Sequence, residues 1–243
     1  MPEGDTIHRA ANTLNIALAG RGVTRFETAL AQLAGVSVEG RTVERVIAVG
    51  KHLIIEFSGD LHLHTHMRMH GEWHIYRPGE RWQRRRDAMR IVIETDAWVA
   101  VAFNVPVAEF RKQDLHRILG PDLVGETFDA DEAMRRIRER EDSEIANALL
   151  NQRVVAGIGN EYKSEVLFAS GVNPFALVRD LSDDEIATIL RNARKLMRAS
   201  VRPQYVYGRG GKPCRKCGTP IAYAKQGPDV RGTYWCPRCQ GER

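Results

Sequence analysis

The chain has 243 residues, a net charge of +5, 43% hydrophobic residues and 28% charged residues, which is typical of a globular protein with one large or two modest cores. No run of about 18 apolar residues occurs, and the first thirty positions lack the basic-then-apolar layout of a signal peptide. These features argue against a membrane or secreted protein, and we expect a cytoplasmic one with no membrane partner.

The first residues, MPEGDT, precede a predicted helix over residues 6–19, which has apolar residues at helical spacing and ends at Gly20. If the initiator methionine is removed, the secondary amine of Pro2 is exposed, and the carboxyl of Glu3 lies one residue away. The pair is either a loose end of the chain or a catalytic couple.

Short strand patterns separated by turn signals fill the region from Val23 to about Val107 and predict a β-sandwich or a barrel-like domain. The predicted strands cover residues 43–49, 52–57, 61–66, 72–76, 89–95 and 97–103. Lys51 follows Gly50 at the end of one of these strands. Its ammonium either grips phosphate or moves protons in a cleft, or it belongs to the solvated surface.

Five of the eight histidines lie between residues 61 and 75. Strand alternation places His62, His64 and His66 on one face. These side chains either form a second metal site or hydrogen-bond to neighbours and to phosphate.

Arg68, Met69, His70 and Gly71 are predicted to form a hairpin turn. An apolar wedge at such a tip can enter a DNA helix, whereas Met69 buried in the core is the alternative. The arginine-rich run over residues 81–90 predicts a loop that either adds non-specific affinity or is simply solvated.

Helical periodicity begins after Gly120-Pro121-Asp122, with predicted helices over residues 128–140, 143–159, 160–170 and 182–201. Gly157 and Gly159 interrupt two of them, and Asn160 is placed to cap the next helix. Backbone amides at that helix start, together with the Asn160 side chain, would bind phosphate, unless the segment is only a tightly packed turn.

From position 200 onward, nine basic residues face two acidic ones, whereas the rest of the chain sums to −2. This basic tail indicates a polyanion such as nucleic acid, with an inert solvated surface as the alternative. It also contains all four cysteines, which form two CxxC pairs typical of a closed, structural four-thiolate zinc site; two disulfides are the alternative. The predicted zinc ligands are Cys214, Cys217, Cys236 and Cys239. Arg231 lies between the pairs, near a predicted hairpin tip.

The order of these motifs (PEG, a strand ending in GK, H-x-x-M-x-G, GPD, GIGN and the finger) resembles the Fpg/Nei superfamily of DNA glycosylases over nearly the whole chain. PEGDT, YWCPRCQ and the finger spacing resemble its endonuclease VIII branch. The resemblance implies an α+β multidomain fold with three parts. These are an N-terminal β-sandwich flanked by helices (1–120), a helical helix-two-turns-helix domain (121–201) and a C-terminal β-hairpin zinc finger (202–243).

The resemblance also implies a mechanism. Pro2 would attack the sugar C1′ of a damaged nucleotide and form an iminium, and Glu3 would act as acid and base. Lys51 would assist this chemistry and contact phosphate, and Arg231 would bind phosphates beside the lesion and assist δ-elimination. Asn160 would bind phosphate.

His66 would contact DNA, and Arg68, Met69 and His70 would fill the void left by an everted base. The family often has Glu at the position of Thr6, so that helper is missing here or its role passes to Asp5.

The resulting prediction is a monomeric bifunctional glycosylase and AP lyase that binds one structural zinc ion and acts on damaged DNA, preferably on oxidised pyrimidines. The alternatives are a purine-preferring formamidopyrimidine-DNA glycosylase and a zinc-finger protein that binds DNA without chemistry.

Overall fold

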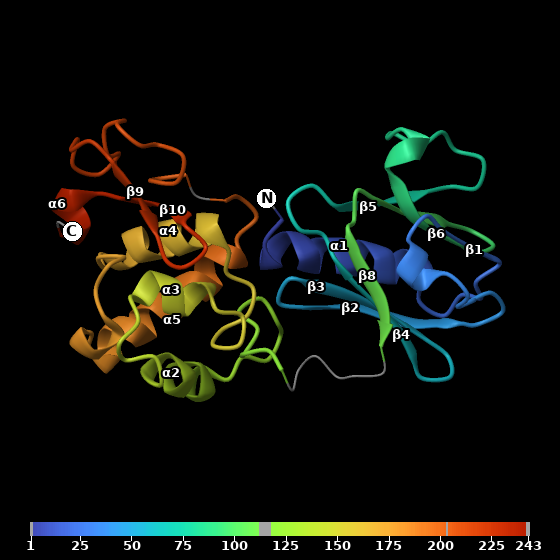
Figure 1. Cartoon of the computed structure of the whole chain (residues 1–243), viewed down its shortest axis with the longest axis horizontal. Helices are drawn as coiled ribbons and strands as arrows, with labels where there is room; N and C mark the ends of the chain where they lie inside the picture. The colour runs from blue at the N-terminus through green and yellow to red at the C-terminus, as the bar shows by residue number, and fades with distance from the viewer. Residues whose placement is uncertain (1, 112–117, 203, 242–243) are drawn as a thin grey trace. The chain divides into compact units, whose positions relative to one another are not determined.

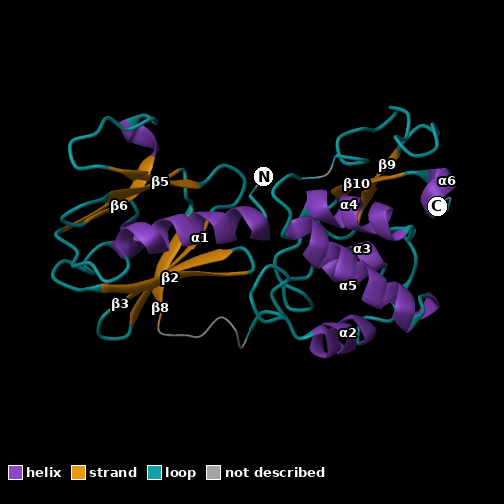
Figure 2. Cartoon of the chain, turned by 180° about the vertical axis from the view of Figure 1, so that it is seen from behind, coloured by secondary structure: helices purple, strands orange, loops and turns teal. Residues whose placement is uncertain are grey.

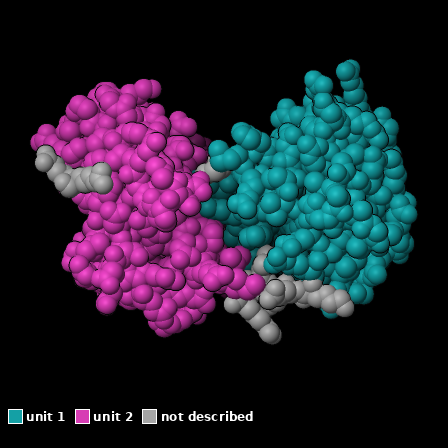
Figure 3. Space-filling model, in the orientation of Figure 1, with its two compact units in different colours: residues 1–115 teal, residues 116–243 magenta. Residues whose placement is uncertain are grey.

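The structure, a computed structural model, describes residues 2–111, 118–202 and 204–241. The chain divides into two compact units, which we call unit 1 (residues 1–115) and unit 2 (residues 116–243), drawn in different colours in Figure 3. Among the described residues, none of the helices combines the length and the apolar character that crossing a bilayer requires.

Over residues 2–111, unit 1 contains one helix, α1 (Gly4–Leu18), and two four-stranded antiparallel sheets. The first sheet has the order β2-β3-β4-β8, formed by Val43–Val49, His52–Phe57, Leu61–His66 and Val107–Arg111. The second has the order β1-β6-β7-β5, formed by Arg25–Thr28, Met89–Glu94, Val99–Phe103 and Glu72–Tyr76. Short 3₁₀ turns cover Ala31–Leu33 and Arg86–Ala88.

The core of unit 1 lies between the two sheets, as a sandwich requires. Leu53 and Leu63 enter it from the first sheet, and Ile91 enters it from the second. The apolar face of α1, including Ile7 and Leu14, packs into the same core, and Figure 2 shows the helix between the two layers of strands. The predicted β-sandwich is therefore confirmed.

The segment Arg68–Gly71 does not close a hairpin, so that prediction was wrong. β4 pairs with β3 and β8, whereas β5 pairs with β7 alone among the described strands, and the segment therefore connects the two sheets. A sharp turn with a glycine is compatible both with a hairpin within one sheet and with a connection between two sheets. Only the long-range pairing of the strands decides between the two. Gly71 is required here because a Cβ would lie 2.5 Å from the carbonyl oxygen of Met67.

Unit 2 is helical and ends in a two-stranded hairpin. Its helices are α2 (Ala130–Arg138), α3 (Ile145–Leu150), α4 (Asn160–Ser170), α5 (Asp183–Met197) and the short α6 (Pro237–Gln240), and a 3₁₀ turn covers Val178–Asp180. β9 (Ala222–Gln226) pairs with β10 (Arg231–Trp235) to form the hairpin. Figure 1 shows α4 beside β10, and the two elements are in contact.

The predicted helix over residues 143–159 is shorter in the structure, where only Ile145–Leu150 is helical. The side chain of Gln152 stabilises the turns that follow. Its amide nitrogen donates to the carbonyl oxygens of Leu150 and Ile158, and its oxygen accepts from the N–H of Gly157. Gly157 has a φ of 106°, which ordinary side chains rarely adopt. The loop ahead of α4 is therefore fixed by one side-chain amide.

Candidate functional site

The start of α1 places a carboxyl group beside Pro2. The helix begins at Gly4, two residues earlier than predicted, so Glu3 is its N-cap residue, and the carbonyl oxygen of Glu3 accepts hydrogen bonds from the N–H groups of Thr6 (2.9 Å) and Ile7 (3.1 Å). Glu3 is fully buried, whereas Pro2 is partly exposed. The positive end of the helix dipole favours a negative charge at this position. Burial and helix geometry thus fix a carboxyl group next to the second residue of the chain.

Asp5 is the residue that could take the role of the acid missing at position 6. It is buried and forms an ion pair with Arg9. Its carboxylate accepts a hydrogen bond from the Arg9 guanidinium at 2.9 Å and one from the Thr6 hydroxyl at 3.3 Å. The Arg9 side chain is 56% exposed and that of Asp5 only 1%. The pair holds Asp5 along the helix, at the usual spacing of four residues.

Lys51 lies in the turn between β2 and β3, after Gly50, whose φ is 57°. It is one of the cations close to His52 and His66, whose rings meet edge to face with centroids 5.0 Å apart. Burial is the main cause that lowers the pKa of His66 to about 4, and His52, Arg68 and Lys51 lower it further. Lys51, His52, His66 and Arg68 therefore form one basic cluster in unit 1.

His66 is neutral at neutral pH in this cluster. Its Nδ1 accepts a hydrogen bond from the backbone N–H of Arg68 at 3.1 Å, so the ring hydrogen is on Nε2. His66 can therefore donate one hydrogen bond from Nε2 to a phosphate oxygen without carrying a charge.

The connector between the sheets presents polar and apolar side chains to solvent. Met69 is 54% exposed, so the alternative of a buried Met69 is wrong, and the core position belongs to Met67 instead. Arg68 takes a left-handed φ of 52°. A hollow of about 480 Å³ is lined by Met67, Arg68, Met69, His70, Arg90, Asn104 and Pro106. The three predicted void-filling residues thus share one concave surface.

The alternative of a second metal site on β4 is not supported within the described residues. His62 and His64 stack with ring centroids 6.3 Å apart, but neither belongs to a group of three or more potential ligands that could hold one ion. His64 is 3% exposed, and neither ring nitrogen has a hydrogen-bond partner among the residues that the structure describes. Burial is the largest cause that lowers its pKa to about 4.

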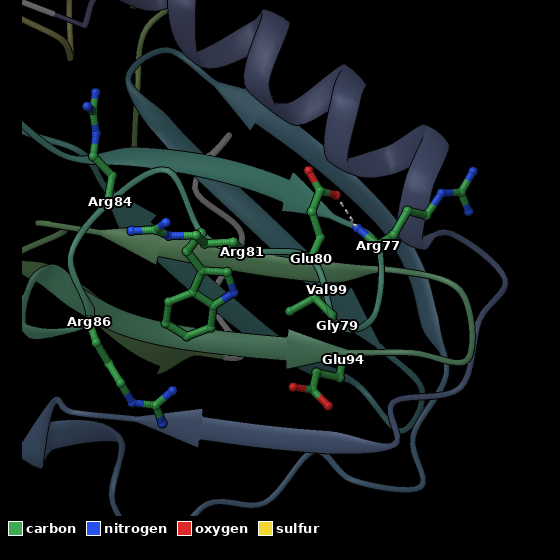
Figure 4. A pocket seen from close by; sticks show the side chains of 9 residues that line it. Arg77, Gly79, Glu80, Arg81, Arg84, Arg86, Glu94 and Val99 are labelled. Atoms are coloured by element: carbon green, nitrogen blue, oxygen red, sulfur yellow. Dashed lines mark hydrogen bonds between the residues drawn. The ribbon is translucent and has the colours of Figure 1, made fainter.

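The arginine-rich loop between β5 and β6 is anchored by ion pairs. Arg84 pairs with Glu72, and Arg86 pairs with Glu27. Trp82 packs edge to face on Phe103, on the outer side of the second sheet. A hollow of about 430 Å³ lies beside this loop and is lined by Arg77, Arg81, Arg84 and Arg86, among others. Figure 4 shows these four side chains.

In unit 2, Asn160 does not cap α4 as predicted. Gly159 is the N-cap residue and Asn160 is the first helical residue. The Asn160 amide nitrogen donates to the carbonyl oxygen of Gly232 at 2.8 Å, and its oxygen accepts from Nζ of Lys163 at 2.8 Å. The side chain therefore joins the helix start to the hairpin.

Arg231 lies at the tip of the β9–β10 hairpin, as predicted. It is the first residue of β10 and faces Gln226 across the hairpin, after a turn in which Val230 takes a φ of 54°. A left-handed φ is strained for a β-branched residue. The Arg231 side chain is 48% exposed and lies 3.5 Å from Asp229. Its guanidinium is thus presented on an exposed turn, beside Asp229 on the same turn.

The four cysteines come together in the finger. Their sulfur atoms all lie within 4.8 Å of one another, and Sγ of Cys217 lies 3.4 Å from Sγ of Cys236. All four are free thiols, so the disulfide alternative is wrong. Tetrahedral Zn–S bonds of about 2.3 Å place sulfur atoms about 3.8 Å apart, which fits this cluster. Burial raises the pKa of Cys239 to about 12, so zinc would have to displace a proton there.

The two antiparallel sheets, the helical unit and the four-thiol hairpin finger define an α+β zinc-finger protein. Two family models for formamidopyrimidine-DNA glycosylase match it, the N-terminal domain over residues 1–106 and the H2TH domain over residues 119–206. A third, described as a zinc finger found in FPG and IleRS, matches residues 211–241.

Relatives cover the whole chain. A Streptomyces coelicolor protein named probable endonuclease 8 2 is 40% identical over 259 residues, 99% of this chain and 94% of the relative. A Mycolicibacterium smegmatis protein named DNA-(apurinic or apyrimidinic site) lyase Nei2 is 36% identical and covers 99% of both chains. The chain belongs to the Fpg/Nei family of DNA glycosylases, in its endonuclease 8 branch.

Solved structures support the fold. Lactococcus lactis formamidopyrimidine-DNA glycosylase, bound to DNA that contains an AP site, has a TM-score of 0.84. The match covers 99% of this chain and 100% of that one at 22% identity, so it bears on architecture alone.

Proposed function

We propose that the protein is a bifunctional DNA glycosylase and AP lyase of base excision repair. The observation that carries the proposal is the fully buried carboxyl group of Glu3, held at the start of α1 directly after Pro2. A protein that only bound DNA would have no use for a buried acid beside its second residue. Family membership and the names of the relatives, endonuclease 8 and AP lyase, agree with this function.

Pro2 is the nucleophile once Met1 has been removed. An α-amine has a pKa of about 8, so a useful fraction is neutral near pH 7. Its nitrogen forms a bond to the sugar C1′, the glycosidic bond breaks, and the base leaves with a proton. The sugar ring opens to a cationic iminium, which acidifies C2′. Loss of a C2′ proton expels the 3′ phosphate, and a second elimination expels the 5′ phosphate.

Glu3 moves protons to the opening sugar and from it. Lys51 contacts phosphate and assists this step, and His66 donates a hydrogen bond from Nε2. Arg68, Met69 and His70 occupy the space that the everted base leaves in the duplex.

In unit 2, the first amides of α4 and Asn160 bind phosphate, and Arg231 binds the backbone beside the lesion and assists the second elimination. The four cysteines hold one structural zinc ion. The three-domain division at residues 1–120, 121–201 and 202–243 also remains our proposal, supported by the spans of the three family models.

The substrate class is oxidised pyrimidine in DNA, which agrees with the endonuclease 8 names of relatives at 36–40% identity. A preference for oxidised purines is the alternative, because a formamidopyrimidine-DNA glycosylase of Pediococcus pentosaceus is also similar, at 27% identity. The protein acts as a monomer on DNA, in the cytoplasm and at the nucleoid.

Borohydride reduction during the reaction with abasic DNA tests the proposal. The wild type is expected to give a covalent adduct, and so is the control Pro78→Ala, which changes an exposed proline. The rate of strand cleavage should fall at least about 100-fold in Pro2→Ala and in Glu3→Gln. Equal trapping by a form that retains Met1, in which the nitrogen of Pro2 is an amide, would exclude Pro2 as the main nucleophile. Oligonucleotides with single oxidised pyrimidines or purines then identify the preferred lesion.

A further inference from the structure

Lys163 is buried inside unit 2, one helical turn after Asn160. The residue is 1% exposed, and its Nζ lies 2.8 Å from Oδ1 of Asn160 and 2.7 Å from Oγ1 of Thr233. A third acceptor, the carbonyl oxygen of Gly232, lies at 3.3 Å. An ammonium group has three N–H donors and no acceptor, so all three of these oxygens can accept from it.

The hydrogen bonds of Lys163 are part of a chain that runs from Lys163 through Thr233 and Gln226 to Glu144. The Thr233 hydroxyl donates its own hydrogen to Oε1 of Gln226 at 2.7 Å, which leaves a lone pair of Oγ1 for Nζ of Lys163. The amide nitrogen of Gln226 donates to Oε2 of Glu144 and to the carbonyl oxygen of Pro174, both at 2.9 Å. A cation on α4 is thus joined to a carboxylate ahead of α3 through both strands of the hairpin.

This network surrounds the position of Arg231. Gly232 and Thr233 are the next two residues of β10, and Gln226 is the register partner of Arg231 on β9. Arg231 and Thr233, two residues apart on a strand, lie on the same face of the hairpin. Lys163 therefore holds the hairpin directly behind its exposed tip.

The opposite face of the hairpin is closed by packing. A Cβ on Gly232 would lie 2.8 Å from the ring of Tyr223, so that ring occupies the space of a side chain. Tyr223 and Tyr234 contact each other with centroids 4.9 Å apart. At the turn, a Cβ on Gly227 would lie 2.3 Å from Oδ1 of Asn147. The hairpin is therefore held on both faces, by aromatic rings on one and by the Lys163 hydrogen bonds on the other.

We propose that Lys163 is a positioning residue, which fixes the Arg231 hairpin against the first turn of α4 so that both address the same stretch of DNA backbone. The inference rests on the proposed function of Arg231. An apolar side chain of similar length in this place usually costs no stability, because desolvating an ammonium offsets what its hydrogen bonds contribute. A buried lysine is therefore better explained by the geometry that it imposes than by the stability that it adds.

The test compares Lys163→Met with Lys195→Met, which removes a cation from an exposed position on α5 of the same unit. With abasic DNA in single turnover, Lys163→Met should retain borohydride trapping and cleavage by the first elimination within about threefold of wild type, because Pro2 and Glu3 are unchanged. Its yield of the second elimination product should fall by about tenfold, because the Arg231 guanidinium is no longer held in place. Lys195→Met should match the wild type.

Two further measurements separate positioning from other roles. Amide hydrogen exchange over residues 222–235 should become faster in Lys163→Met while the finger keeps its zinc. Thr233→Val, which removes the same hydrogen bond from the other side, should produce the same shift in products, and the double variant should be no worse than either single one.

Three outcomes would overturn the inference. Unchanged products and exchange would show that Lys163 holds nothing in place. A salt dependence of DNA binding reduced by about 0.9, with Thr233→Val normal, would show a direct phosphate contact instead. Loss of zinc with a uniform loss of all activities would show a purely structural role. If the wild type gives no trapped adduct, the proposed function fails, and the exchange measurement still decides whether Lys163 fixes the hairpin.

Discussion

The two units hold their candidate site residues by different means. In unit 1, Glu3 is fixed by a helix whose apolar face packs between two sheets. In unit 2, Arg231 stands on a hairpin held by a buried polar network and by a cluster of four thiols. All seven described histidines lie in unit 1, and all four cysteines lie in unit 2. Acid and chelators should therefore affect different units of the same chain.

Removal of zinc should give the largest difference between the units. The finger core is small, with Val206, Ile221 and two cysteines as its buried members, and a structural zinc site contributes about 10–16 kcal/mol in isolated finger peptides. A chelator should therefore unfold residues 211–241 and abolish DNA binding, while exchange in β3 and β4 stays slow. Hydrogen exchange measured by mass spectrometry checks both units at once.

Zinc, but not magnesium, should restore the protein after chelation, because thiolates select the softer ion. A finger that keeps its protection in the chelator would show that the thiols alone hold it together. Loss of protection in β3 and β4 would show that the two units depend on one metal site.

The contrast between the units was only partly predictable. The bounds of β2, β3, β4 and β5 and the start of α4 follow from alternation and turn residues, which are local signals. β1 (Arg25–Thr28) and β8 (Val107–Arg111) were not predicted as strands, because short edge strands gain their stability from partners far along the chain. The assignment of β4 and β5 to different sheets depends on the same long-range pairing.

The site residues also differ in how far local sequence signals predict them. The four cysteines are predictable because their spacing alone encodes the chemistry, whereas Lys163 was missed. A lysine inside a helix is usually solvated, and only the position of the hairpin turns this one into a buried residue. A lysine three residues after Asn160, on the same helix face, was the available signal.

Acidification should lower the stability of unit 1, whereas zinc removal affects unit 2. The folded state has a pKa of about 4 for His64 and for His66, whereas the unfolded chain binds these protons near pH 6.5. Stability is therefore complete above about pH 6.5 and is lost as pH falls toward about 4, because the unfolded state binds more protons in that window. We expect a loss of roughly 1–2 kcal/mol per histidine after solvent screening.

His64→Phe should flatten this pH dependence, and His70→Gln, at an exposed position, should not. The free energy of unfolding of unit 1, measured from pH 7 to 4.5 by hydrogen exchange in β3 and β4, checks both variants. An unchanged slope in His64→Phe would mean that the buried imidazole takes up its proton as easily as an exposed one.

The smallest expected effect tests whether the helical and finger parts of unit 2 unfold together. Ser182 and Glu185 form a capping box at the start of α5, and its loss in Ser182→Ala should cost about 1 kcal/mol, whereas Ser200→Ala, at an exposed position, should cost almost nothing. Because α4 packs against both α5 and β10, a cooperative unit would transmit this loss to the hairpin, and exchange of β10 would accelerate as much as that of α5. Acceleration confined to α5 would instead make the finger a separate unit that is fastened to α4 through Lys163 and the metal.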